Sequence, residues 1–170
     1  ARQASNSPPY RLAFLGRWHP NKGVDLMLGA LGLLTAQDWE NIEEVRIFGG
    51  GPLERQVRDL TAKLEAGGRP VKIGGYLAKN EAAALIGWAD YLMLPSRIES
   101  IPVIFSDAAQ VRTPIIATPV GDLPTLGERY EFGVLADDSS EDAYCRAIRA
   151  AIADQPGRFQ AGLEIVAREF

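Results

Sequence analysis

The amino-acid sequence predicts a single α/β domain built on a parallel sheet. The chain has 170 residues, which is about the length of one domain. It is 46% hydrophobic and 24% charged, the balance of a globular protein with a full core. Short apolar runs alternate with stretches in which apolar residues recur at helical spacing, a pattern typical of parallel strands joined by helices.

Each apolar run is short enough for a buried strand and ends in glycine, proline or a polar loop. The predicted strands cover residues 11–15, 45–48, 71–73, 91–94, 114–117 and 132–135. The predicted helices cover residues 24–34, 52–66, 81–87, 102–111 and 141–153, and a last one begins near residue 159. Pro52 is expected at the first helical position of the second helix, because proline suits that position. Gly67 and Gly68 are expected to end that helix.

Right-handed crossovers turn this order of elements into a Rossmann-like, doubly wound parallel sheet of about six strands with helices on both faces. In such a sheet, ligands bind beyond the carboxyl ends of the strands. The loops that follow the strands are therefore where binding or catalytic residues are expected.

Charge and composition exclude several classes of partner. The 18 Lys and Arg residues and the 22 Asp and Glu residues give a net charge of −4. This balance argues against a general surface for binding nucleic acid and against a polybasic surface for binding a membrane. No run approaches the ~18 apolar residues of a membrane helix. The single cysteine, Cys145, cannot form a disulfide within the chain. Residues 1–9 are polar, lack the apolar core of a signal peptide and are interpreted as a linker. A cytoplasmic location is expected.

The loop after the first predicted strand carries two cations, Arg17 and Lys22, between Gly16 and Gly23. At a strand's carboxyl end and before a helix, they could hold a diphosphate. Two solvated loop cations are the alternative. His19 has no partner at metal-ligand spacing and is interpreted as an ordinary loop residue.

The glycines at 49–51 do not complete a known phosphate-binding motif. They lack the last glycine of a dinucleotide fingerprint, and no glycine loop in the chain ends in Gly-Lys-Ser or Gly-Lys-Thr. They either form a tight turn or leave space for the sugar of a ligand.

The loop at residues 95–103, after the fourth predicted strand, is the most informative. Backbone amides from Ser100 to Val103 precede or open a helix, so they could bind an anion without a metal. Asp107 lies one helical turn beyond Val103. Glu99 and Asp107 could therefore present two carboxylates to one ligand, or each could be an ordinary exposed acid.

Five motifs, taken together, resemble the nucleotide-sugar-binding half of group 1 retaining glycosyltransferases, which have the GT-B fold. The resemblance covers nearly the whole chain after the linker, in the family's order. The motifs are Gly-Arg…Pro-Asn-Lys-Gly at 16–23, Phe-Gly-Gly-Gly-Pro-Leu at 48–53, Gly-Tyr-Leu at 75–77, Ala-Asp-Tyr-Leu-Met-Leu-Pro-Ser at 89–96 and Glu-Ser-Ile-Pro at 99–102.

The resemblance implies a role for each matching residue. Arg17 and Lys22 would hold the donor diphosphate, and Glu99 would contact hydroxyls of the transferred sugar, so these three are the candidate catalytic residues. The other implied donor-binding residues are Gly16, Gly50, Tyr76 and Leu77, the backbone of Ser100, Ile101, Pro102 and Val103, and Asp107 on the ribose. The family usually has Glu at position 107, Gly at 122 and Glu at 125, where this chain has Asp107, Asp122 and Thr125.

The implied function is binding of a nucleoside diphosphate sugar, from which the complete enzyme transfers the sugar to an acceptor. Residues 10–170 would form the donor-binding domain, the C-terminal half of a GT-B fold. The N-terminal acceptor domain would be absent, so the isolated chain is expected to bind donor and to transfer nothing. No metal or other cofactor is expected, because the sequence contains no Asp-X-Asp. A full-length form peripheral to the inner face of a membrane is compatible with the resemblance.

Other functions stay open on the residues alone. A glycoside hydrolase could use Glu99 and Asp107 as its two carboxylates, although it would leave Arg17 and Lys22 unexplained. A non-catalytic Rossmann-like nucleotide-binding module, of flavodoxin or receiver type, is a second alternative. A degenerate transferase kept for partner binding is a third, suggested by Asp107 and Thr125.

Overall fold

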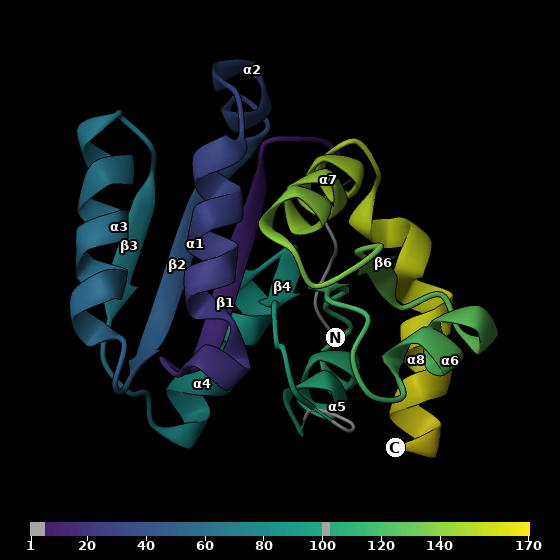
Figure 1. The fold of residues 1–170 in the computed structure, drawn as a ribbon. Helices are drawn as coiled ribbons and strands as arrows, with labels where there is room; N and C mark the ends of the chain where they lie inside the picture. The colour runs from purple at the N-terminus through teal and green to yellow at the C-terminus, as the bar shows by residue number, and fades with distance from the viewer. Residues whose placement is uncertain (1–5, 100–102) are drawn as a thin grey trace.

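A computed structural model describes residues 6–99 and 103–170. Six parallel strands form one sheet in the order β3-β2-β1-β4-β5-β6 (Figure 1). This confirms the predicted Rossmann-like, doubly wound α/β architecture. The strands are β1 (Tyr10–Arg17), β2 (Ile42–Gly50), β3 (Val71–Gly74), β4 (Tyr91–Leu94), β5 (Ile115–Ala117) and β6 (Gly133–Leu135).

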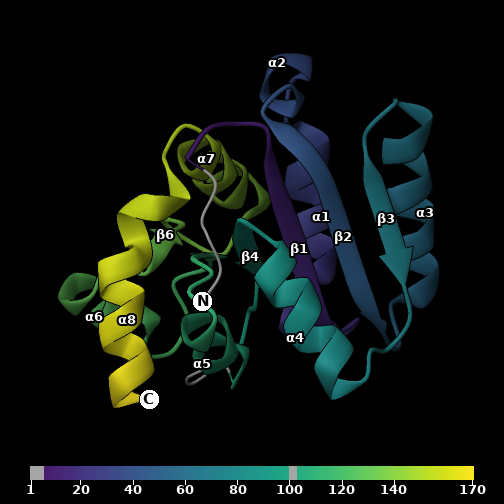
Figure 2. The ribbon, with the colours of Figure 1, turned by 180° about the vertical axis from the view of Figure 1, so that it is seen from behind.

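Helices cover both faces of the sheet. Seen from opposite sides in Figures 1 and 2, α1, α3 and α7 lie on one face and α4, α5 and α8 on the other, in agreement with the contacts of α1 with α3 and α7 and of α5 with α4 and α8. The α-helices are α1 (Val24–Leu33), α2 (Ala36–Trp39), α3 (Glu54–Ala66), α4 (Lys79–Trp88), α5 (Val103–Gln110), α6 (Leu123–Arg129), α7 (Glu141–Ile152) and α8 (Gln160–Glu169). Two 3-10 helices, η1 (Pro20–Lys22) and η2 (Pro156–Phe159), connect them. No helix in the described part of the chain is long and apolar enough to cross a membrane.

The core lies between these helices and the central strands. All four residues of β4 are buried, as are Leu12, Ala13 and Phe14 of β1. Burial on both faces explains why these strands are nearly continuous apolar runs in the sequence. The carboxylate of Asp90 accepts a 2.8 Å hydrogen bond from the amide of Arg11 and so joins the beginnings of β4 and β1.

Three local predictions differ from the structure. Pro52 is not the first helical residue: it lies in a turn, and α3 begins at Glu54. The amide of Leu53 donates to the carbonyl of Trp18 at 2.9 Å, which holds this residue in the turn. Helices α2 and α6 were not predicted, because each is short. The N-terminus of α2 is closed by a capping box between Thr35 and Asp38.

Strands β1 and β4 are neighbours in the sheet although they are far apart in the chain. The chain runs outward from β1 to β3, and then returns to β4 on the other side of β1. The connection after β1 leads towards β2 and the connection after β4 leads towards β5, in opposite directions along the sheet. This divergence leaves a crevice at the carboxyl ends of β1 and β4. The fold therefore brings the loop at 18–23 next to the loop at 95–99.

Two buried tyrosines allow a test of the packing around these strands. The hydroxyl of Tyr144 in α7 donates to the carbonyl of Ile116 at 2.6 Å. The hydroxyl of Tyr91 in β4 is buried and has no hydrogen-bond partner among the described residues. Burial raises the pKa of both phenols.

We expect Tyr144→Phe to lower the free energy of unfolding by about 1–2 kcal/mol, because it leaves a buried carbonyl short of a donor. We expect Tyr91→Phe to raise it by about 1 kcal/mol, because it removes an unpaired polar group. Urea denaturation of both variants measures the difference, and equal losses would contradict this account of the core.

Candidate functional site

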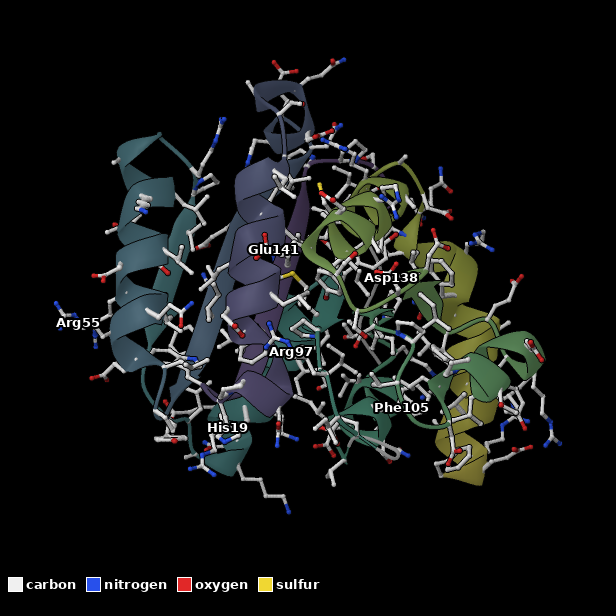
Figure 3. All side chains as sticks on the ribbon, viewed as in Figure 1. His19, Arg55, Arg97, Phe105, Asp138 and Glu141 are labelled. Carbon is white, nitrogen blue, oxygen red and sulfur yellow. The ribbon has the colours of Figure 1, made fainter. Side chains whose placement is uncertain are left out.

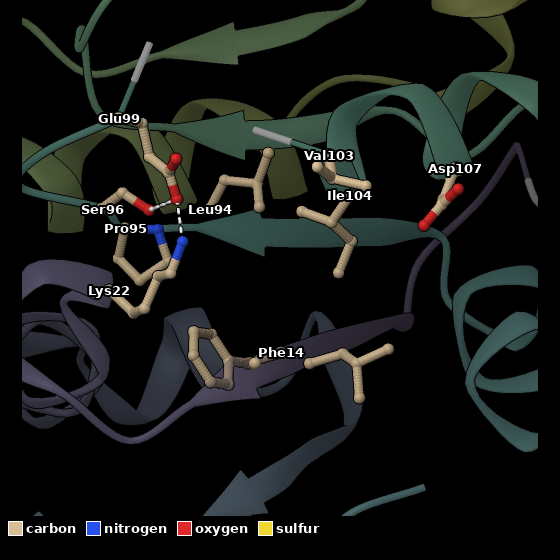
Figure 4. A pocket seen from close by; sticks show the side chains of 11 residues that line it. Phe14, Lys22, Leu94, Pro95, Ser96, Glu99, Val103, Ile104 and Asp107 are labelled. Atoms are coloured by element: carbon tan, nitrogen blue, oxygen red, sulfur yellow. Dashed lines mark hydrogen bonds and ion pairs between the residues drawn. The ribbon is translucent and has the colours of Figure 1, made fainter. Parts of the chain in front are cut away.

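A pocket of about 360 Å³ lies at the carboxyl ends of β1 and β4, the place where the fold predicts a ligand. Its lining comes from the end of β1, from Lys22 at the end of η1, from the end of β4 and the loop after it, and from the first turns of α5 (Figure 4). The lining residues are Phe14, Leu15, Gly16, Lys22, Leu94, Pro95, Ser96, Glu99, Val103, Ile104 and Asp107. Five residues singled out from the sequence are thus brought together: Gly16, Lys22, Glu99, Val103 and Asp107.

An ion pair closes one end of the pocket. The ammonium group of Lys22 contacts the carboxylate of Glu99, which also accepts a 3.5 Å hydrogen bond from the hydroxyl of Ser96. The Glu99 side chain is 14% exposed and that of Lys22 43% exposed. The acid is therefore held within the site, while the cation remains accessible to a ligand.

The second acid lies at the other end of the pocket. In Figure 4, Asp107 is separated from Glu99 by the apolar side chains of Leu94, Val103 and Ile104. The two carboxylates therefore do not converge on one atom. An elongated ligand could contact both, with its middle over an apolar floor.

Local backbone structure places Lys22 at this site. His19 caps the 3-10 helix η1, because its Nδ1 atom accepts a 3.0 Å hydrogen bond from the amide of Asn21. This gives His19 a structural role, in line with its interpretation as an ordinary loop residue. Gly23 ends η1 with φ +70°, and a Cβ atom there would lie 1.8 Å from the carbonyl oxygen of Pro95. The loop bearing Lys22 is thus packed directly on the end of β4.

A second group of predicted residues lies beside the pocket and does not line it. Arg17 is exposed, and its backbone lies opposite that of Gly50 where β1 and β2 are neighbours in the sheet. The hydroxyl of Tyr76 donates to the carbonyl of Gly50 at 2.6 Å. Leu77 lines a different cavity, with Phe48 and Trp88, under α4. Ser100, Ile101 and Pro102 lie outside the described residues.

Sequence reasoning missed the residues that hold the loop after β4. Arg97, which is labelled in Figure 3, forms two hydrogen bonds with the carboxylate of Asp25 in α1, at 2.8 and 3.0 Å. Burial raises the pKa of the Asp25 carboxyl, but the hydrogen bonds and charge of Arg97, together with hydrogen bonds from the backbone amides of Asp25 and Leu26, hold the pKa below its usual value. The hydroxyl of Thr118 donates to the carbonyl of Ser96 from the far side. No sequence signal links Arg97 to Asp25, since 72 residues separate them.

Within residues 6–99 and 103–170, no three His, Cys, Asp or Glu side chains are grouped closely enough to hold a metal ion. The charged groups lining the pocket are Lys22, Glu99 and Asp107. The site chemistry that these residues offer is ion pairing and hydrogen bonding.

Comparison with known proteins identifies the family of the chain. Residues 9–154 match the family model described as "Glycosyl transferases group 1". The D-inositol 3-phosphate glycosyltransferase of Jonesia denitrificans is 29% identical over 166 residues, which cover 94% of this chain and 39% of that relative. The chain thus spans about two fifths of the length of this relative.

Solved structures share the fold at low sequence identity. A sucrose-phosphate synthase from Thermosynechococcus elongatus matches with a TM-score of 0.72 and 21% identity, over 95% of this chain and 40% of that one. TarM from S. aureus matches with a TM-score of 0.76 and 16% identity, over 99% of this chain and 33% of that one. Because the family model matches most of the sequence, the chain belongs to the group 1 glycosyl transferases.

Proposed function

We propose that this chain binds a nucleoside diphosphate sugar and forms the donor-binding part of a retaining glycosyltransferase. The observation that carries the proposal is the pocket between β1 and β4, which has one accessible cation, Lys22, and one carboxylate at each end. Family membership supports sugar transfer as the reaction. A glycoside hydrolase would require Glu99 and Asp107 to flank a single bond, and their places at opposite ends of the pocket favour two separate contacts.

The diphosphate would bind at the Lys22 end. Lys22 is already paired with Glu99, so it must exchange that carboxylate for a phosphate oxygen when the donor enters. Arg17, exposed at the end of β1, would supply the second cation, and the amides that open α5 would add to it. Hydrogen bonds to charged groups contribute ~1.5–3 kcal/mol each, so the two cations give roughly 3–6 kcal/mol. Micromolar binding needs about 8 kcal/mol, and the sugar, ribose and base contacts would supply the rest.

The remaining contacts follow from the length of the pocket. Glu99, released from Lys22, would accept hydrogen bonds from the transferred sugar, and Asp107 would bind the ribose. Tyr76 and Leu77 would lie against the base, with Gly50 leaving space beside Tyr76. The TarM structure that shares this fold is a complex with UDP, among other ligands, which supports a nucleotide as the kind of ligand.

Transfer would proceed by departure of the nucleoside diphosphate. The bond between the anomeric carbon and the diphosphate oxygen would break, the acceptor oxygen would form the new bond to the anomeric carbon, and the proton of the acceptor hydroxyl would pass to the departing diphosphate oxygen. Arg17, Lys22 and the start of α5 would stabilise the negative charge that grows on the leaving oxygen, without a metal. We further propose that the transfer retains the configuration at the anomeric carbon. The enzyme would be cytoplasmic, and its full-length form could be peripheral to the inner face of a membrane. The acceptor would bind mainly to an N-terminal domain, so this chain alone is expected to transfer nothing.

A panel of ligands tests the proposal. The chain is heated with UDP-, GDP- and ADP-sugars, and with simple glycosides as the hydrolase control. A specific ligand at one hundred times its Kd should stabilise the fold by ~2.7 kcal/mol, which raises the unfolding temperature measurably. Stabilisation by a nucleoside diphosphate sugar is the expected result. No response to any nucleotide, or release of free sugar from simple glycosides, would overturn the proposal.

Arg17 gives a sharper test. We expect Arg17→Ala to weaken binding of the best donor at least roughly tenfold, because it removes one of two cations from the diphosphate. Calorimetric titration measures the change. Arg55→Ala is the matched control, since Arg55 is equally an exposed arginine but lies on α3 (Figure 3). Unchanged affinity in Arg17→Ala would remove Arg17 from the site.

A further inference from the structure

Arg97 makes four of the hydrogen bonds that join the loop after β4 to the loop after β1 and to the first turn of α1. Its guanidinium group donates to both carboxylate oxygens of Asp25, at 2.8 and 3.0 Å, and to the carbonyl of Pro20 at 2.7 Å. Its backbone amide donates to the carbonyl of Asn21 at 2.9 Å. The planar guanidinium matches the carboxylate in both direction and spacing, which a lysine in this place could not do.

These bonds surround Lys22 in the sequence. Pro20 and Asn21 precede Lys22, and Asp25 follows it, so Arg97 binds the backbone or side chain on both sides of the cation. Arg97 is also two residues before Glu99, which is the ion-pair partner of Lys22. A shift of either loop would therefore change the position of Lys22 relative to Glu99.

We infer that Arg97 and Asp25 are positioning residues for the donor site, and that they act by fixing Lys22 relative to Glu99. The inference deepens the proposed function and rests on it for the identity of the ligand. Neither residue lines the pocket, so neither is expected to contact the donor. A simpler reading is that Asp25 only stabilises the first turn of α1 and that Arg97 only screens its charge.

The chain contains a matched control for this ion pair. The Nε atom of Arg149 lies 2.9 Å from Oδ2 of Asp38, and the two side chains are 42% and 19% exposed. The Nη1 atom of Arg97 lies 2.8 Å from Oδ1 of Asp25, and these side chains are 37% and 21% exposed. The control pair joins α7 to α2, and α2 follows the C-terminal end of α1 (Figure 1), whereas Lys22 of the pocket precedes the N-terminal end of α1. The loss of either arginine should therefore lower the unfolding temperature to a similar extent.

The first experiment measures Lys22 itself, without any ligand. The unmutated chain, Arg97→Ala and Arg149→Ala are treated briefly with an acetylating reagent, and the rate at Lys22 is compared by mass spectrometry with that at exposed Lys63 on α3. In Arg97→Ala the relative rate at Lys22 should rise roughly threefold, as expected on release of an ion pair of ordinary strength. In Arg149→Ala it should not change. Equal relative rates in all three proteins would overturn the inference, whatever ligand the chain binds.

The second experiment measures nucleoside diphosphate affinity by calorimetry with UDP, GDP and ADP. Arg97→Ala should weaken binding about tenfold, corresponding to 1.4 kcal/mol, and Arg149→Ala should stay within about twofold. Adding Arg97→Ala to Lys22→Ala should cause no further loss, because Arg97 acts through Lys22. Additive losses in this double-mutant cycle would show a general structural effect and overturn the inference. If the unmutated chain binds none of the three nucleotides, the proposed function fails, and the acetylation rates alone then decide the positioning role.

Discussion

Replacing Gly23 by alanine is expected to lower the free energy of unfolding by at least about 3 kcal/mol, the upper end of the loss that single substitutions usually cause. Two effects combine at this position. Gly23 has φ +70°, where a side chain costs ~1–2 kcal/mol, and its new Cβ atom would lie 1.8 Å from the carbonyl oxygen of Pro95. Because that oxygen belongs to the backbone, the loops after β1 and β4 must separate. Chemical denaturation measures the loss.

Two other glycines separate these effects. Gly68 has φ +81° with nothing within 4 Å of an added Cβ, and Gly32 lies on the exposed side of α1 with equally open space and no φ in the left-handed range. Gly68→Ala should cost only the ~1–2 kcal/mol of its backbone conformation. Gly32→Ala should be neutral or stabilise by up to about 1 kcal/mol. If Gly23→Ala costs no more than Gly68→Ala, the close packing of the two loops is wrong.

Substitutions at the Lys22–Glu99 ion pair are expected to have opposite effects on nucleotide affinity. Lys22→Ala should weaken binding of a nucleoside diphosphate roughly 10- to 100-fold, since it removes a charged hydrogen bond and leaves Glu99 without its cation beside the phosphates. Glu99→Gln should strengthen binding of the same ligand about fivefold, because Lys22 no longer exchanges a carboxylate for the phosphate. Calorimetric titration measures both.

The sugar changes this expectation for Glu99. A nucleoside diphosphate sugar should gain less from Glu99→Gln than the sugar-free nucleotide does, because the same substitution weakens contacts with the sugar hydroxyls. The ratio of the two affinities therefore reports on the role of Glu99. Asp107→Asn is the comparison variant, at the far end of the pocket (Figure 4): because both ligands carry the ribose that Asp107 is proposed to bind, it should weaken both and leave the ratio of their affinities unchanged. Weaker binding of the sugar-free nucleotide by Glu99→Gln would contradict the exchange of partners at Lys22.

The parallel sheet could be predicted because its strands are buried on both faces. Residues 91–94 form a continuous apolar run, and all four are buried in β4. The same reasoning failed where local packing outweighs a residue's usual preference. Pro52 suits the first position of a helix, yet the hydrogen bond from the amide of Leu53 to the carbonyl of Trp18 holds this segment in a turn, so that α3 begins only at Glu54. The four-residue α2 is too short for a hydrophobic period to show it.

The site could be predicted in part, because each loop after a strand carries its own signal. Lys22 ends η1 after β1, Glu99 lies in the loop after β4 and Asp107 lies one turn into α5, and the order of elements brings these three segments together. Their mutual arrangement could not be predicted. The ion pair of Lys22 with Glu99 and the hydrogen bonds of Arg97 to Asp25 each join residues more than 70 positions apart in the chain, and nothing in residue type or spacing encodes such a contact. The exposure of Arg17 outside the pocket lining also depends on the folded chain.

The central claim is that a nucleoside diphosphate sugar binds in the pocket at the carboxyl ends of β1 and β4, with its diphosphate on Lys22. A crystal structure of the chain with the most stabilising ligand of the panel tests this directly. We expect a phosphate oxygen within hydrogen-bond distance, about 2.7–3.2 Å, of the ammonium group of Lys22, and Glu99 turned from Lys22 towards the sugar. A diphosphate bound elsewhere on the chain, with the Lys22–Glu99 ion pair intact, would contradict the claim.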